Sequence, residues 1–536
     1  MKKQLLILAM AGAMAMFGAN AALATCNISP LNGDAQCVDF NIHGASAEYD
    51  FFNAVAPGFL ETEFGCSSAK MLGPAGALGN TSKYGVTVGS ECTVNGKKTT
   101  IVFRYSSKAS WDGIAGITGE NEILAGYTNQ TGDEDACVVA GDGFDVRTYA
   151  DENQCNWGTG VCGDGTNGVT PSGNPVGTLC AHAMVGASDV AADELIENST
   201  GSLKGPNGSY VVFRNFTTSH GVNTTQGATN GTGKTIQWPL ANNYGDELLV
   251  VPFSFYANNS VTASTCVGGA MAGSPCASAS DCDDPNAYKG GANNGTCTSA
   301  QISNMTREMA VQIFAGVVDN WADFGTGYVN LPIQVCFRHA GSGSHATLDW
   351  TVMHGAGQLM GTLATAQGST NGPGINPAGY MWFNDGTGDA LNCANYQASN
   401  WGAVTYADSD YTTVQAGRFN KTYANVHELT YQGQPGSHAA LVGGSYDFYT
   451  TEHLFTTSHS LSYSDSQTPP QNYAINMYAQ LKNYLASPSS LPSDEAYFWA
   501  LPTQMTWYYG PAATPPLQEL YQTYPFLSQD PTEPNY

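Results

Sequence analysis

Short apolar runs of the strand type alternate along this chain with amphipathic runs of the helical type. Residues 38–42 and 99–105 alternate with the two-residue period of a strand, and residues 181–185 form a third strand candidate. Residues 247–253 are almost continuously apolar, which is typical of a strand buried on both faces. Strands that alternate with helices in this way build a sheet covered by helices, so we predict an α/β protein.

Length and charge limit the classes of function. The 536 residues are 42% hydrophobic, which is enough for a large core and for two or more domains or lobes. Charged residues make up only 12%, and 18 basic against 44 acidic residues give a net charge of −26. Nucleic acids and anionic membrane surfaces need a basic face on their partner, so we predict that neither is a partner here.

The first 24 residues have the pattern of a secretory signal peptide. Lys2 and Lys3 precede the apolar residues 5–17, and Ala22-Leu23-Ala24 supplies an A-x-A cleavage site. No later run reaches the roughly 18 uninterrupted apolar residues of a membrane helix. We therefore predict cleavage after Ala24 and a soluble periplasmic or secreted protein that is not inserted in a membrane.

Cysteine usage supports export and weighs against a lipid anchor. All 14 cysteines lie from Cys26 onward, and an even number in an exported chain indicates up to seven disulfides. Leu23 to Cys26 is close to a lipoprotein box, but lipidation of Cys26 would leave an odd number. A lipoprotein is therefore the less favoured alternative.

Residues 263–300 form an insertion that is rich in Gly, Ala, Ser, Asp and Asn. With almost no apolar residues, such a segment needs covalent staples. The four cysteines are spaced by 10, 6 and 15 residues, whereas a zinc site usually contains a C-x₂₋₄-C pair. We therefore predict two local disulfides over a zinc site, formed by Cys266, Cys276, Cys282 and Cys297. Three other polar stretches, 67–98, 128–178 and 218–235, are predicted to be surface insertions.

The densest cluster of polar signals lies in residues 301–350. Residues 303–315 have the apolar spacing of an amphipathic helix, and residues 333–337 alternate as a strand that ends at Arg338. A glycine and serine turn follows, with a second helix from about His345. Glycines let a backbone approach a ligand, serines and a helix start donate hydrogen bonds, and arginine adds a forked cation. This combination predicts a seat for an oxyanion.

This block and four other segments together resemble the periplasmic phosphate-binding proteins of ABC phosphate importers. The matches occur in the family's order and cover most of the mature chain. The block itself consists of Thr306-Arg307-Glu308, Ile313-Phe314-Ala315-Gly316, Asn320-Trp321-Ala322-Asp323 and Arg338 to Ser344. The other segments are Gly44-Ala45-Ser46-Ala47, Ser110-Trp111-Asp112-Gly113, Val185-Gly186-Ala187-Ser188-Asp189 and the returning strand Gly443 to Phe448.

The resemblance implies a two-lobe, type II periplasmic-binding-protein fold with mixed sheets, two crossover strands and a ligand in the cleft. Lobe 1 would comprise residues 25–250 and the C-terminal return 444–536. Lobe 2 would comprise residues 251–443, including the cysteine-rich insertion.

Carried over by position, the resemblance assigns the anion ligands Arg338, Ser342, Gly343 and Ser344 in lobe 2, and Ser46, Ser110 and Asp189 in lobe 1. Asp189 would accept the proton that phosphate carries at neutral pH and repel sulfate, which has none. Asp189 is also positioned to cap a helix over residues 191–197.

Two loops depart from the family pattern. Glu48-Tyr49 stands where relatives place a hydroxyl residue and an aromatic one, and Trp111-Asp112 replaces small residues. A second buried acid would disfavour a dianion, and the insertions have no counterpart in ordinary importers.

The leading hypothesis is an exported, monomeric solute-binding protein for phosphate or a related oxyanion, with an ABC permease as a possible partner. An alternative is a secreted or cell-surface interaction protein that kept the fold and lost or changed the ligand. A lesser alternative is a secreted phosphatase. The ten His are scattered with no H-E-x-x-H motif, and Gly341-Ser342-Gly343 lacks the G-x-S-x-G elbow. We therefore predict no catalytic residue, no metal and no cofactor.

Overall fold

A computed structural model describes the chain from Cys26 to Thr506 with gaps. The described residues are 26, 28–72, 84–107, 109–118, 146–156, 161–162, 178–190, 203–204, 210–211, 228–229, 235–236, 246–283, 295–338, 342–353, 381–384, 386–395, 401–415, 422–457, 460–461, 473–493 and 495–506. The predicted signal peptide, the turn at Gly341 and the helix expected over 191–197 lie outside them.

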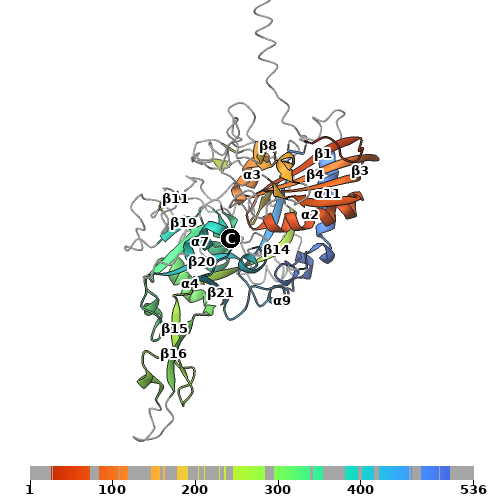
Figure 1. Ribbon diagram of the computed structural model, residues 1–536. Coiled ribbons are helices and arrows are strands. Elements are labelled where there is room, and N and C mark those ends of the chain that lie inside the picture. The colour runs from red at the N-terminus through yellow and green to blue at the C-terminus, as the bar shows by residue number, and fades with distance from the viewer. Residues whose placement is uncertain are drawn as a thin grey trace, which may run out of the picture.

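Two α/β lobes make up the described part of the chain (Figure 1). Lobe 1 contains the strands β1 (Gln36–Gly44), β2 (Ser68–Leu72), β3 (Tyr84–Val94), β4 (Lys97–Ser107), β9 (Val185–Ser188) and β22 (Tyr449–Phe455), with the helices α2 (Glu48–Phe64), α3 (Ser110–Thr118) and α11 (Tyr473–Leu485). Lobe 2 contains β17 (Asn304–Met305), β18 (Ile333–Arg338), β19 (Met381–Asn384), β20 (Gly402–Asp408) and β21 (Val426–Tyr431), with α4 (Arg307–Phe314), α5 (Gly343–Thr347), η4 (Leu348–Met353) and α7 (Thr387–Asn395).

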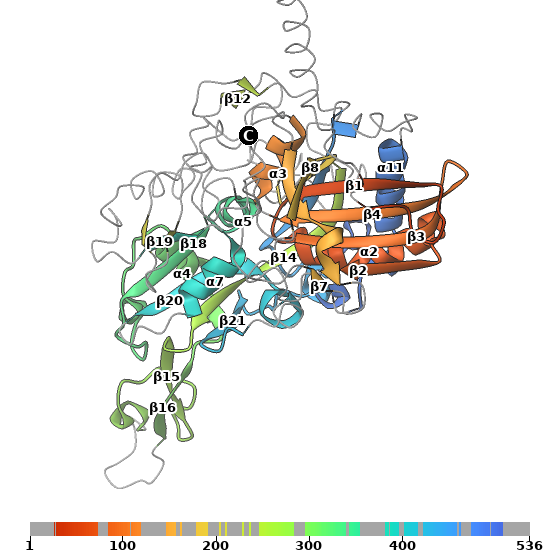
Figure 2. The same ribbon diagram turned by 45° about the horizontal axis from the view of Figure 1, so that its top comes forward.

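The long strand β14 (Asp246–Asn258) joins the two lobes in one mixed sheet, of order β19-β18-β20-β14-β22-β9-β1-β4-β3-β2. Its first half, up to Pro252, pairs with β22, and its second half pairs with β20 and β21. Figure 2 shows β14 running between the lobes. The chain passes from lobe 1 to lobe 2 along β14 and returns in β22, so the carboxyl ends of strands from both lobes face the same junction.

Smaller elements complete the described residues. They are β5 (Val146–Ala150) paired with β8 (Thr178–His182), β6 (Cys155–Asn156) with β7 (Val161–Cys162), β10 (Leu203–Lys204) with β11 (Tyr210–Val211), β12 (Ala228–Thr229) with β13 (Thr235–Ile236), α9 (His438–Val442), η5 (Tyr411–Gln415) and the short turns η1 (Glu152–Gln154), η3 (Trp321–Phe324), η7 (Pro488–Ser490), η8 (Glu495–Tyr497) and η9 (Pro502–Gln504). No described helix combines the length and the apolar character needed to cross a bilayer.

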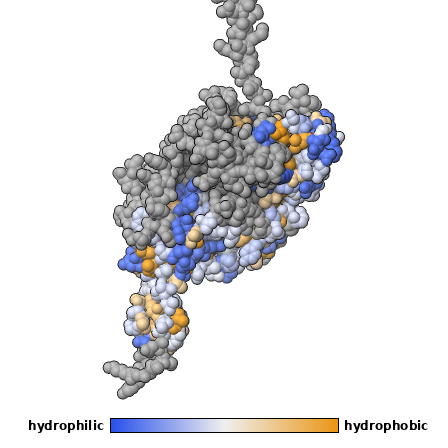
Figure 3. All heavy atoms as spheres, in the orientation of Figure 1, coloured by the Kyte–Doolittle hydropathy of each residue, from blue (hydrophilic) through white to orange (hydrophobic). Residues whose placement is uncertain are grey.

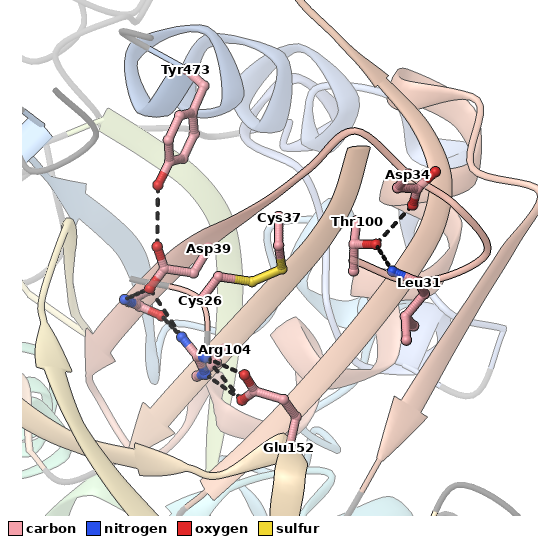
Figure 4. Close-up of a disulfide and its surroundings, with 10 residues drawn as sticks. Cys26, Leu31, Asp34, Cys37, Asp39, Thr100, Arg104, Glu152 and Tyr473 are labelled. Carbon is pink, nitrogen blue, oxygen red and sulfur yellow. Dashed lines mark hydrogen bonds and ion pairs between the residues drawn. A yellow bond between two sulfur atoms is a disulfide. The ribbon is translucent and has the colours of Figure 1, made fainter. Parts of the chain in front are cut away.

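The alternating sequence of β1 gives lobe 1 two different faces. Val38, Phe40 and Ile42 are buried in the apolar core, where the aromatic side chains of α2 also lie. Asp39 on the other face joins a buried polar network (Figure 4): the Arg104 guanidinium lies 3.0 Å from Asp39 and 2.8 Å from Glu152. Burial of paired charges is tolerated because the partners satisfy one another. This network ties β1 and β4 to the segment after β5.

Aromatic packing fills lobe 2. The ring of Phe314, on the buried face of α4, stands 5.5 Å from the rings of Phe255, Phe337 and Tyr406. The Cys336–Cys393 disulfide links β18 to α7. Because β18 is fixed from both faces, Arg338 at its end has a rigid support.

The cysteine-rich insertion is a hairpin that projects from lobe 2 (Figures 1 and 2). It consists of β15 (Thr262–Val267), η2 (Ala279–Cys282) and β16 (Thr296–Gln301), and disulfides Cys266–Cys282 and Cys276–Cys297 close it. The predicted local disulfides are therefore present. Figure 3 shows the hairpin as a narrow projection with apolar residues on part of its surface. Val267 in β15 is more than half exposed.

Four predictions about local structure need correction. Residues 67–98, expected as an insertion, contain β2 and β3, because the Gly, Ser and Thr content of β3 hid a strand that is buried along most of its length. The helix expected from 303 starts at Arg307, since Thr306 accepts a hydrogen bond from the Met309 N–H and caps it. The expected strand 181–185 is split between β8 and β9. The return strand expected over 443–448 is β22, which begins only at Tyr449.

Oxidation should leave almost no free thiols. Five disulfides lie within the described residues, including Cys26–Cys37 (Figure 4) and Cys66–Cys92, and no described cysteine is free. Disulfides of this kind are typical of proteins in an oxidising, extracytoplasmic compartment. Thiol titration of the denatured, non-reduced protein should find at most about two thiols among the 14 cysteines. Six or more would contradict export to an oxidising compartment.

Lobe 2 should lose stability as the pH rises toward neutrality. Burial raises the pKa of the Glu428 carboxyl to about 7, while a 2.7 Å hydrogen bond from Ser254 opposes the shift. The folded state therefore binds this proton more tightly than the unfolded state does, so the contribution is complete below about pH 4.5 and is lost as the pH passes about 7. Glu428→Gln should flatten the pH dependence of the unfolding free energy by up to about 3 kcal/mol between these limits. An unchanged profile in urea titrations from pH 4 to 8 would contradict this assignment.

Candidate anion site at the lobe junction

The end of β1 carries the first predicted ligand, Ser46, to the junction. Gly44 has φ +149°, and a Cβ there would lie 2.0 Å from the carbonyl oxygen of Ala187 at the end of β9. Only glycine allows this close approach, so β1 and β9 end side by side. Two residues later, the Ser46 hydroxyl lies 3.1 Å from that of Thr387, the first residue of α7 in lobe 2.

Arg338 reaches from the end of β18 to both of these hydroxyls. Its Nη1 donates to the Thr387 Oγ1 at 2.7 Å and to the Ser46 Oγ at 3.3 Å. Its backbone N–H donates to the hydroxyl of Tyr406 at 3.0 Å. With 1% of its surface exposed, Arg338 is among the largest fully buried side chains of the described residues. A buried guanidinium held by hydroxyl groups keeps its charge available for an anion.

Ser110 and Gly343 bring the two lobes into direct contact. The Ser110 Oγ accepts hydrogen bonds from the backbone N–H groups of Asp189 and Gly343, each at 3.1 Å. Ser110 begins α3 in lobe 1, whereas Gly343 begins α5 in lobe 2. The predicted ligands from the two lobes therefore meet at this hydroxyl.

Asp189 lies at the centre of this contact. Its Oδ2 accepts a hydrogen bond of 3.2 Å from the Ser344 hydroxyl, and its backbone oxygen accepts one from Thr450. Its Oδ1 is buried and has no hydrogen-bond partner among the described residues, and neither does the Oγ of Ser342. Burial raises the pKa of Asp189 to about 6, although the Arg338 charge and the Ser344 hydrogen bond lower it. A buried acceptor without a donor is costly, so Asp189 is prepared to accept a proton from a ligand.

All seven sequence-predicted ligand residues therefore come together at one junction. Ser46 and Arg338 meet around Thr387, while Ser110, Gly343, Ser344 and Asp189 meet around the Ser110 hydroxyl. Ser342 directly precedes α5, and its hydroxyl makes no capping hydrogen bond. Their chemistry is one cation, several hydroxyl and N–H groups and one unpaired carboxylate oxygen. This set can bind an oxyanion that still carries a proton.

Sequence reasoning missed Thr387 and Glu452. Thr387 follows β19 in a Gly386-Thr387-Gly388 turn of the same type as the predicted anion turn, and that similarity is the signal that could have found it. Glu452 is the single acid of the buried strand β22, a signal that was hidden because the strand was expected six to seven residues too early. Its carboxylate lies with those of Glu48 and Asp189.

The anion site therefore contains one buried acid, Asp189, and has two more, Glu48 and Glu452, next to it. Burial raises the pKa values of Glu48 and Glu452 well above their ordinary value, and the Asp189 charge raises them further. Trp111, whose replacement of a small residue was a second departure from the family pattern, has a side chain outside the described residues.

Gly343→Ala should disturb the junction. A Cβ at Gly343 would lie 2.5 Å from both the Asp189 Cβ and the Ser110 Oγ, which no real Cβ contact permits. The lobes would have to separate locally, at a typical cost of about 1–3 kcal/mol for overpacking. We expect a lower midpoint in urea unfolding together with weaker anion binding. Gly433→Ala, where a Cβ would meet nothing but φ is +77°, shows the effect of backbone strain away from the junction and should leave anion binding unchanged. Anion binding unchanged in Gly343→Ala would contradict steric separation of the lobes.

Comparisons with known proteins return structures but no family. No family model matches the chain. An ABC-type phosphate transport receptor from Vibrio cholerae is similar with 14% identity and a TM-score of 0.24, over 45% of this chain and 66% of that one. A substrate-binding protein of a phosphate ABC transporter from Clostridium perfringens, solved with bound phosphate, is similar with 13% identity and a TM-score of 0.26, over 46% and 70%. A phosphate-binding protein from Stenotrophomonas maltophilia is similar with 11% identity and a TM-score of 0.23, over 50% and 76%.

Proposed function

We propose that this protein is an exported solute-binding protein that holds phosphate, or a related protonated oxyanion, at the junction of its two lobes. The observation that carries the proposal is the environment of Asp189. A buried carboxylate with one unpaired oxygen lies among the donors Arg338, Ser344 and the N–H of Gly343. An unpaired acceptor beside several donors fits an anion that both donates and accepts hydrogen bonds.

The proposal includes the route and the mode of action. Residues 1–24 would direct export and be removed after Ala24, and the mature chain would act as a monomer that delivers its ligand to a membrane permease. The disulfides support an oxidising compartment. We propose binding without turnover, so the purified protein should not hydrolyse p-nitrophenyl phosphate; steady hydrolysis that disappears on Arg338→Ala would favour the phosphatase alternative.

A second candidate function is supported by the acids at the junction. Glu48 and Glu452 place two further acids beside the anion site, and ionisation of either would weaken binding of a free dianion. The projecting hairpin gives the chain an additional exposed surface. These features favour an interaction protein with an altered ligand as the runner-up.

Isothermal calorimetry with phosphate, arsenate and sulfate distinguishes the two functions. We expect one saturable site for phosphate and arsenate, and sulfate binding weaker by at least about tenfold because it brings no proton for Asp189. Absence of heat and of any thermal stabilisation with millimolar phosphate would overturn the solute-binding proposal and favour the interaction protein.

A further inference from the structure

Three carboxylates, which lie in or just after three neighbouring strands, converge at the lobe junction. Glu48 is the first residue of α2 after β1, Asp189 follows β9, and Glu452 lies in β22. The strands β1, β9 and β22 are consecutive in the sheet. One oxygen of each carboxylate lies within 4.8 Å of those of the other two, and the three residues are at most 1% exposed.

A separate observation is that these acids have few donors. Glu48 and Glu452 have only each other as side-chain hydrogen-bond partners. Asp189 accepts from Ser344 through Oδ2, but its buried Oδ1 has no hydrogen-bond partner among the described residues. The charged groups that act most on Glu48 and Glu452 are other acids, whereas Asp189 has Arg338 nearby. An uncompensated buried carboxylate costs several kcal/mol, so three buried acids gathered this closely with so few donors favour a positively charged partner.

The geometry suits a single hard cation. Calcium binds oxygen ligands at 2.3–2.6 Å, so two oxygens on opposite sides of one ion lie at most about 5 Å apart. Carboxylate oxygens without sulfur or imidazole select Ca²⁺ or Mg²⁺ over zinc and copper. Calcium tolerates irregular, largely protein-made coordination, whereas Mg²⁺ retains several waters.

We propose that Glu48, Asp189 and Glu452 form a binding site for a divalent cation, with Ca²⁺ preferred. Three carboxylates, one Ca²⁺ and the Arg338 guanidinium sum to zero charge. The site stands on these residues alone and does not depend on phosphate binding.

One consequence does rest on the proposed function. Because Asp189 belongs to both sites, a divalent ion bound there would offset two of the three negative charges beside Arg338. Phosphate and the cation should then strengthen each other's binding by the same factor, as linkage requires.

Terbium luminescence provides the test. The charges of Glu48, Glu452 and Asp189 all contribute to raising the pKa of Tyr105, so this tyrosine lies near the proposed site. It can therefore sensitise Tb³⁺ bound there. We expect chelator-treated, full-length mature protein to give tyrosine-sensitised Tb³⁺ emission that Ca²⁺ displaces. The double variant Glu48→Gln/Glu452→Gln keeps side-chain size and should bind Ca²⁺ at least about 100-fold more weakly. Glu61→Gln/Glu63→Gln, on the same helix, controls for attraction of cations by the net charge of −26.

The outcomes separate the cation site from the anion site. If wild type shows no Ca²⁺-displaceable emission, or if the Glu48/Glu452 variant binds Ca²⁺ as wild type does, the cation site is wrong. The acids share a proton instead of a cation if wild type does not bind Ca²⁺ and the Glu48/Glu452 variant has an unchanged circular dichroism spectrum and a higher melting temperature. Phosphate calorimetry in chelator tests the anion site by itself: phosphate binding without Ca²⁺ binding would retain the proposed function and reject only this inference. Glu452→Gln alone serves if the double variant does not fold.

Discussion

Arg338→Ala should weaken phosphate binding by about 2–5 kcal/mol, or roughly 30- to 4,000-fold, the usual cost of truncating one partner of a desolvated charge pair. The guanidinium is 1% exposed, and it is held toward the junction by the hydroxyls of Thr387 and Ser46. Removing it leaves the anion facing Asp189 with hydroxyl and N–H donors only. Calorimetric titration with phosphate measures the loss.

Arg307→Ala is the matched control for this variant. Arg307 also lies in lobe 2, but it is partly exposed and pairs with the surface residue Asp447 at 3.1 Å. The exposed pair is worth at most about 1 kcal/mol, so phosphate binding should stay within a few-fold of wild type. Equal losses in the two variants would mean that general destabilisation, and not the junction, explains the effect of Arg338→Ala.

Asp189→Asn should relax the discrimination between phosphate and sulfate. The variant keeps the shape of the side chain and the acceptor for Ser344, but it removes the negative charge that repels a fully deprotonated anion. Like charges in contact cost several kcal/mol, so the ratio of sulfate to phosphate dissociation constants should fall by at least about tenfold. Competition calorimetry with the two anions at pH 8 measures this ratio.

The exposed Asp319, in the loop before η3, provides the control for Asp189→Asn. Asp319→Asn changes the net charge by the same amount without touching the junction, so the selectivity should remain that of wild type. If both variants change selectivity alike, the long-range field decides it. If neither variant changes the selectivity, Asp189 is not the group that distinguishes a protonated anion from a deprotonated one.

The positions of the proposed ligand residues follow more directly from the sequence than do the bounds of the elements that carry them. Arg338 and Ser344 are recognisable because a regular apolar strand leads directly into a polar glycine and serine turn, and such local patterns survive folding unchanged. Ser46 and Asp189 likewise follow strand ends. The carboxyl ends of neighbouring parallel strands share an edge of the sheet, so these residues meet in space once the strand order is known.

Glu452 and Thr387 show where this reasoning ends. Each contributes through pairing partners far along the chain: Glu452 lies opposite Leu249 of β14, and Thr387 contacts Ser46 across 341 residues. Nothing local specifies such contacts, because they depend on the topology that brings β22 beside β9. The strand β3 was missed for a related reason, since its burial between β2 and β4 overrides the weak strand propensity of its glycines and serines.

The acids at the junction also explain why the resemblance alone could not define the ligand. Glu48 is visible in the sequence as a departure from the family pattern, but its meaning depends on Glu452, which only the folded chain brings within reach. A site with one cation and three acids differs from a simple anion seat. A bound divalent cation would neutralise part of the negative charge of these acids and so allow an anion to bind beside them. The metal content of the purified protein is therefore relevant to every anion titration.

The most direct test of anion binding at the lobe junction is a crystal structure of the mature protein grown with arsenate, located by the anomalous scattering of arsenic. We expect one arsenate in contact with the Arg338 guanidinium and the Ser344 hydroxyl, with one of its oxygens within hydrogen-bond distance of the Asp189 Oδ1. An ordered junction without arsenate at millimolar concentration, or arsenate bound only elsewhere, would contradict it.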